Sequence, residues 1–116
     1  MNTAEIEKSK GHILIEIIEY VPNSVVSKTI IRKTTGNVSV IAIADGENLA
    51  EKISPFDTFV QIIDGKAEVV IDEKSNLLRT GEAIIIPAHT SHAVRANEQF
   101  KMVTTVIKSG YEDSPI

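Results

Sequence analysis

The strongest constraint on the fold is a series of short apolar runs, rich in β-branched residues, that turn-forming pairs separate. The runs are too short for helices, and apolar and polar residues alternate in them with the period of two that half-buried strands have. Many short strands at close spacing favour a β-sandwich or a barrel, and no helical run alternates with them as a parallel α/β sheet requires. We therefore expect an all-β fold, with strands at residues 25–34, 37–44, 58–63, 67–72, 83–86 and 102–107.

Glycine follows Asp or Thr at four places between these runs. Such pairs are typical of turns, because glycine adopts positive φ at no steric cost. We expect an antiparallel barrel of about six to eight strands. Its turns are expected at Gly36, Gly46, Gly65 and Gly81.

The region before the first expected strand divides into two parts. Residues 1–10 are polar and predict a flexible leader, so the expected single domain spans residues 11–116. In residues 13–21, apolar pairs recur four residues apart, which favours a short helix that ends before Pro22. The β-branched residues of this stretch also permit a strand.

The composition excludes several classes of function. Because the chain has no cysteine, disulfide frameworks, zinc knuckles and thiol nucleophiles are excluded. A formal net charge of −4 and scattered basic residues argue against nucleic-acid binding, which requires clustered Lys and Arg. No run approaches the roughly 20 apolar residues of a membrane span, and the polar, acidic start is unlike a secretory signal. We expect a cytoplasmic protein with no membrane partner.

The segment from Gly81 to His92 is the most informative in the chain. Gly81 suits a tight turn, and residues 83–86 form an apolar run of the length of a buried strand. Pro87 lacks an N–H and therefore ends the ladder of that strand. His92 is expected at the start of the following strand, with its side chain available to the barrel interior.

This segment resembles the second sequence motif of the cupin family. Gly81, Pro87 and His92 match the glycine, the proline and the metal-binding histidine of that motif. His89 stands where the motif has its second glycine, and its asparagine falls on Ala96. The resemblance covers about residues 37–107. It implies a jelly-roll barrel, or double-stranded β-helix, with a site inside the barrel mouth. The chain is similar to small single-domain cupins of unassigned function.

The first cupin motif is present in outline but lacks its metal-binding residues. Anchored on Gly65, the ligand positions of that motif fall on Lys52, Ser54 and Thr58, which leaves His92 as the one matching ligand. A transition-metal site needs three or four nitrogen, oxygen or sulfur ligands that converge. We therefore expect neither a bound metal nor another cofactor.

One route to a metal site stays open at this point. Glu51 and Asp57 are carboxylates next to the substituted positions, and His89 lies three residues before His92. Strand alternation directs Glu51 and Asp57 away from the interior, although a β-bulge would reverse this. His89 is expected in a turn from which it could reach the barrel mouth.

The candidate ligand-binding pocket consists of Lys52, Ser54, Thr58, His92 and His89. The leading hypothesis is metal-free binding of a small molecule, with no reaction assigned. Because Lys52 carries a fixed positive charge, an anion is favoured over a cation as that ligand. The alternative is an enzyme, either a metal-independent isomerase or lyase that uses His92 with Lys52 as acid and base, or a metal-dependent oxygenase with atypical ligands.

A homodimer is also expected. The edge strands of a small open barrel are exposed, and residues 13–21 are more apolar than a leader requires. A second copy of the chain would cover both.

Overall fold

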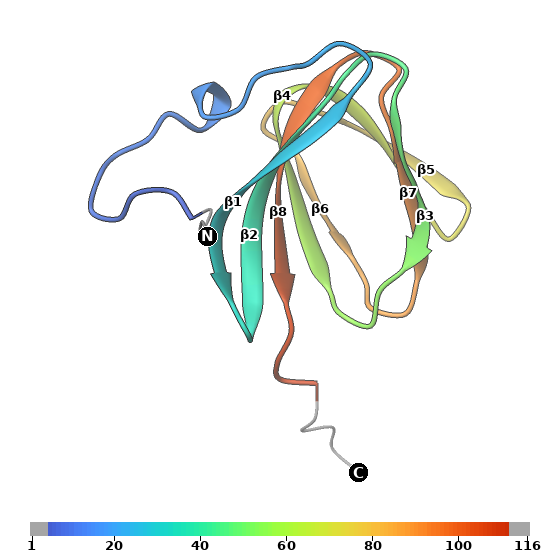
Figure 1. The fold of residues 1–116 in the computed structure, drawn as a ribbon. Coiled ribbons are helices and arrows are strands. Elements are labelled where there is room, and N and C mark those ends of the chain that lie inside the picture. The colour runs from blue at the N-terminus through green and yellow to red at the C-terminus, as the bar shows by residue number, and fades with distance from the viewer. Residues whose placement is uncertain (1–4, 112–116) are drawn as a thin grey trace.

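The computed structural model describes residues 5–111, whose strands form a curled antiparallel sheet with the shape of an open barrel (Figure 1). This confirms the expected all-β fold. Among these residues, no helix has the length and apolar character needed to cross a membrane. The elements are η1 (Leu14–Glu16), β1 (Val25–Lys33), β2 (Gly36–Ile43), β3 (Asn48–Ile53), β4 (Thr58–Ile71), β5 (Lys74–Arg79), β6 (Ala83–Ile86), β7 (Ser91–Arg95) and β8 (Phe100–Ile107).

The long strand β4 belongs to both walls of the barrel. Its first half pairs with β8 and β6, and its second half pairs with β7 and β5. One wall, sheet A, therefore has the order β1-β2-β8-β4-β6, and the other, sheet B, has the order β5-β4-β7-β3. Every pairing is antiparallel, and Figure 1 shows the two sheets facing each other.

The prediction of a turn at Gly65 is wrong. The two strands expected at residues 58–63 and 67–72 are instead one strand, β4. A register shift lies between Ile62 and Asp64, and Gly65 follows it with a φ of +87°. A Cβ atom on Gly65 would lie 2.5 Å from the carbonyl oxygen of Gln99. The Asp-Gly pair therefore bends one strand from sheet A into sheet B instead of reversing the chain. Gly46 and Gly81 do lie in turns, and Gly36 begins β2 directly after one.

The expected N-terminal helix is only a single 3₁₀ turn at Leu14–Glu16. The segment instead lies against the outer face of sheet A, where Ile18 packs on Val40, Ala42 and Val103. The Lys101 ammonium donates a hydrogen bond to the Ile15 carbonyl, so this backbone group is used by the sheet and not by a helix.

The expected flexible leader is described in part. Residues 1–4 lie outside the described residues. At Ile6 the backbone N–H donates to the Ile30 carbonyl over 3.2 Å, and the Glu5 carboxylate accepts from the backbone N–H of Arg32 over 2.7 Å. This backbone hydrogen bond holds the pKa of Glu5 below its ordinary value.

Two of the observed strands, β3 and β5, were not predicted from the sequence. β3 and β5 are edge strands, each paired with one neighbour. Most of their residues are exposed. Since an exposed edge strand needs few apolar residues, its sequence carries little of the alternation that identifies a strand.

The outer face of sheet A keeps several apolar side chains exposed. Ile31, Val38, Thr105, Phe59 and Ile85 lie side by side in one row across its five strands. Ile85 is 60% exposed and Phe59 is 41% exposed. Apolar surface of this kind is suited to a second copy of the chain. The expected homodimer stays a prediction, and a monomer mass from light scattering would contradict it.

Candidate functional site

A cavity of about 360 Å³ lies between the two sheets at one end of the barrel. Side chains from six strands line it, so it is a feature of the barrel interior and not of a single loop. Its apolar lining is mainly Ile41, Leu49, Val60, Ile86, Val94 and Met102. Its polar lining is Lys52, Ser54, Thr58, His92 and Thr104.

A bulge in β3 brings Lys52 into this lining. Leu49 pairs with Val94 and Lys52 pairs with His92, so two residues of β3 stand opposite one residue of β7 between these pairs. Leu49 and Lys52, although three positions apart, therefore both line the cavity. The bulge leaves Glu51 on the other face, where its carboxylate accepts a hydrogen bond from the Ser91 hydroxyl.

His92 is the most buried polar residue of the cavity, at 8% exposure. On β7 it stands between Lys52 of β3 and Ile71 of β4. Its Nδ1 atom is buried and has no hydrogen-bond partner among the described residues. A buried polar atom without a partner costs about 1–3 kcal/mol. Because Nδ1 is sealed, Nε2 is the polar atom that the imidazole can offer to a ligand.

Two loops, residues 54–57 and residues 87–90, lie together at the open end of the barrel (Figure 1). The His89 backbone N–H donates to the Ser54 carbonyl over 2.6 Å, and the Ala88 N–H donates to the Asp57 carboxylate over 2.8 Å. The Tyr111 hydroxyl accepts from the Asp57 N–H over 2.7 Å. These bonds hold the mouth of the cavity in one shape.

The structure brings four of the five candidate pocket residues together. Lys52, Ser54, Thr58 and His92 line the same cavity, with Lys52 exposed at its rim. His89 does not line it, and its side chain is exposed in the loop of residues 87–90. Its φ of +63° lies in the left-handed region that glycine adopts most easily, which accounts for the glycine of the motif at this position.

The route to a metal site through neighbouring residues is not assembled. Glu51 binds Ser91 on the outer face, Asp57 accepts a backbone hydrogen bond in the loop, and His89 is exposed and is not part of the cavity lining. Sequence reasoning also missed Thr104 and Met102 of β8, which no motif marks. Strand alternation in the expected strand 102–107 was the one signal that could have placed them.

The donors of the cavity do not fit a transition metal. Of the described residues that line it, one is a histidine and none is a carboxylate or a cysteine. No cluster of three or more such ligands occurs anywhere within residues 5–111. A metal ion would also meet the positive charge of Lys52, and affinity requires several preorganised donors.

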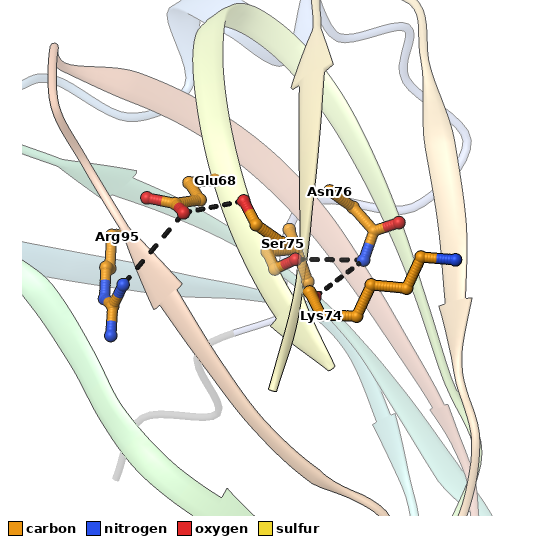
Figure 2. Close-up of polar contacts among 6 residues, drawn as sticks. Glu68, Lys74, Ser75, Asn76 and Arg95 are labelled. Atoms are coloured by element: carbon orange, nitrogen blue, oxygen red, sulfur yellow. Dashed lines mark hydrogen bonds and ion pairs between the residues drawn. The ribbon is translucent and has the colours of Figure 1, made fainter. Parts of the chain in front are cut away.

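A second hollow, of about 520 Å³, lies on the outer face of sheet B. Figure 2 shows the residues beside it, with the Glu68 carboxylate accepting from the Ser75 hydroxyl and lying 4.0 Å from Arg95. The Asn76 amide donates to the carbonyls of Val69 and Lys74. Since the polar groups here bind one another, this surface offers a ligand less than the barrel cavity does.

Comparisons with solved structures give the same fold. A conserved protein of unknown function from Streptococcus pyogenes is 28% identical with a TM-score of 0.86, and the match covers 90% of this chain and 92% of that one. A cupin superfamily protein from Desulfitobacterium hafniense is 26% identical with a TM-score of 0.85, covering 90% and 96%.

A sequence relative and a family model complete the comparison. Protein SchB of Streptomyces halstedii is 33% identical over 63 residues, which are 53% of this chain and 46% of SchB. The chain thus matches less than half the length of that relative. The model of the cupin domain matches residues 39–108, from β2 to the end of β8. With this match and the antiparallel barrel built around β4, the chain belongs to the cupin family.

Proposed function

We propose that the protein binds a small anionic molecule in the barrel cavity, without a metal ion. One observation carries the proposal: of the described residues that line the cavity, Lys52 alone bears a formal charge. No ion pair or hydrogen bond within residues 5–111 engages its ammonium group. The charge is therefore available to a ligand.

The size and the neutral donors of the cavity support the same function. A volume of about 360 Å³ is at the lower end of the range for small-molecule sites. The hydroxyls of Thr58 and Thr104 and the imidazole of His92 can each form a hydrogen bond with a bound molecule. A charged centre beside a few oriented donors fixes both the sign and the position of a ligand's polar group.

The test compares binding of anions with binding of cations to metal-stripped protein by calorimetry. Acetate, butanoate, phosphate and citrate are the anionic probes, and tetramethylammonium and butylamine are the cationic ones. We expect one or more anions to bind and the cations to give no heat.

Matched lysine variants locate the binding site. Lys52→Met removes the charge at the cavity rim, and Lys66→Met removes an exposed charge from the same barrel outside this cavity. Loss of a hydrogen-bonded charge should weaken anion binding about tenfold in Lys52→Met. Lys66→Met should bind like the wild type. Equal binding by both variants would contradict the proposal.

Metal-independent isomerisation or elimination is the second candidate function. The observation that favours it is the direct pairing of His92 with Lys52 across β7 and β3. An imidazole could remove a proton next to a carboxylate or carbonyl while the ammonium stabilises the enolate that forms. Proton NMR in D₂O tests this, because the wild type should exchange that proton of a bound acid and His92→Ala should not.

A further inference from the structure

The polarity of the cavity changes along the barrel axis. In sheet A, the row nearest the mouth contains Thr58 opposite Val106, and the next contains Thr104 opposite Val60. The row below them contains Met102 opposite Ile41, and both of these cavity-lining side chains are apolar. Sheet A therefore presents hydroxyls near the mouth and hydrocarbon at the floor.

Sheet B repeats this gradient on the facing wall. The row nearest the mouth contains Lys52 opposite His92, and the next row contains Leu49 opposite Val94. Val94 is 3% exposed, and like Met102 it belongs to the packed core that closes the barrel beneath the cavity. In each sheet, the cavity lining thus changes from polar near the mouth to apolar at the floor.

We propose that the ligand is a monocarboxylic acid with a short apolar tail, bound with its carboxylate beside Lys52 and its tail on the floor. The inference rests on the proposed function and names its ligand class. A single ammonium balances a single negative charge, whereas a dianion would bring a second charge that no lining cation meets. The apolar floor offers a second polar group no hydrogen bond.

The cavity volume limits the length of the tail. A volume of about 360 Å³ has room for about twelve groups of the size of a water molecule. Because the mouth is open, the carboxylate and its hydrating water occupy part of this space. A tail of about four to seven carbons then fills the remainder.

Calorimetry with the metal-stripped wild type tests the ligand class. The probes are butanoate, hexanoate and octanoate, with hexan-1-ol and hexanedioate as the uncharged and doubly charged matches of hexanoate. Each methylene added between butanoate and hexanoate should lower Kd about fourfold. Hexanedioate should bind about a hundredfold more weakly than hexanoate, because its second carboxylate would lie on the floor. Hexan-1-ol should bind about tenfold more weakly than hexanoate.

Two variants test which part of the cavity causes these differences in affinity. In Lys52→Met, hexanoate should lose its advantage over hexan-1-ol. Val94→Thr places a hydroxyl at the floor at nearly constant volume, and the fourfold gain per methylene should fall to about twofold. Val70→Thr, on the outer face of sheet B, is its matched control and should keep the wild-type increments. The wild-type increments decide the question even if Val94→Thr fails to fold.

The outcomes separate this inference from the function on which it rests. If phosphate or citrate binds more tightly than hexanoate, the cavity is an anion site and the ligand class is wrong. If Kd does not change with tail length, or if hexan-1-ol equals hexanoate in the wild type, the ligand class is also wrong. If no anion of either panel binds, the proposed function itself fails.

Discussion

The two ends of the barrel are built from the same strands but have opposite interiors. At one end, Phe100 of β8 and Ile62 of β4 are fully buried and fill the space between the sheets. At the other end, Thr104 and Thr58 of the same two strands line a cavity. Strand alternation turns all four side chains inward, so only their size and polarity differ. The comparison indicates that the packed end supplies stability and the open end is left for a ligand.

The N-terminal segment adds to the packed end from outside. The Tyr20 hydroxyl donates to the Asp64 carboxylate over 2.6 Å, and the Lys101 ammonium lies 4.8 Å from the centre of the Tyr20 ring. Asp64 and Lys101 are paired residues in the row next to Gly65 and Phe100. Tyr20, Asp64 and Lys101 thus form a clamp on the outside of sheet A. This outer clamp and the buried core around Phe100 stabilise the same part of β4 and β8.

Phe100→Ala should give the largest effect. Removing a fully buried ring from the packed end should lower the free energy of unfolding by about 3–5 kcal/mol, measured by urea denaturation. Phe59→Ala is the matched control, because Phe59 is 41% exposed on the outer face of β4, and it should cost about 1 kcal/mol. Similar losses in the two variants would show that the packed end is not the main source of stability.

Gly65→Ala tests whether the bend of β4 is a requirement of close packing. Both Gly65 and Gly46 have positive φ, which should cost alanine about 1–2 kcal/mol at either position. A Cβ at Gly65 also meets the Gln99 carbonyl at 2.5 Å, whereas nothing lies within 4 Å at Gly46. Gly65→Ala should therefore lower the free energy of unfolding by about 1–3 kcal/mol more than Gly46→Ala. Equal costs would show that the contact relaxes freely.

Tyr20→Phe measures the outer clamp. The lost hydrogen bond should cost about 1–2 kcal/mol at neutral pH. Burial, together with the Asp64 carboxylate, raises the pKa of Tyr20 above its ordinary value of 10.0. Since the folded state retains the proton more strongly, the stabilisation is complete below about pH 10 and is lost as the pH rises above it. The advantage of the wild type over Tyr20→Phe should therefore shrink above that pH. A constant difference up to pH 11 would contradict the clamp.

The sequence predicted the central strands well because alternation is a local signal. The strand expected at residues 83–86 has the bounds of β6. Lys52, Ser54 and Thr58 line one cavity as expected, but a bulge in β3 and the loop of residues 54–57 bring them there, and not alternation alone. The continuity of β4 was not predictable, because the Asp-Gly pair carries a turn signal and its true constraint is the carbonyl of Gln99. That contact joins residues far apart in the chain.

The exposed position of His89 depends on a contact between two loops that are distant in the sequence. His-x-x-His spacing alone left open whether both rings reach the cavity. The backbone of His89 is held in the left-handed region by a hydrogen bond to Ser54 in another loop. Thr104 and Met102 of β8 also line the cavity, but they lie outside both cupin motifs, so the motifs could not predict them. Local patterns thus place strands and faces, whereas pairing between distant strands decides which side chains meet.

His92→Leu should have the smallest effect on stability and the clearest effect on binding. The substitution keeps the side-chain volume roughly constant and removes a buried Nδ1 that has no partner among the described residues. The free energy of unfolding should therefore stay constant or rise by about 1 kcal/mol, because an unpaired buried polar group is replaced by an apolar one. Val94→Ala, two residues along the same strand towards the packed end, should instead lose about 2–3 kcal/mol. Binding of hexanoate, followed by calorimetry, should weaken in His92→Leu because the imidazole no longer offers a hydrogen bond. If His92→Leu lost as much stability as Val94→Ala, the polar residues of the open end would be part of the structural core, and the division between the two ends would be wrong.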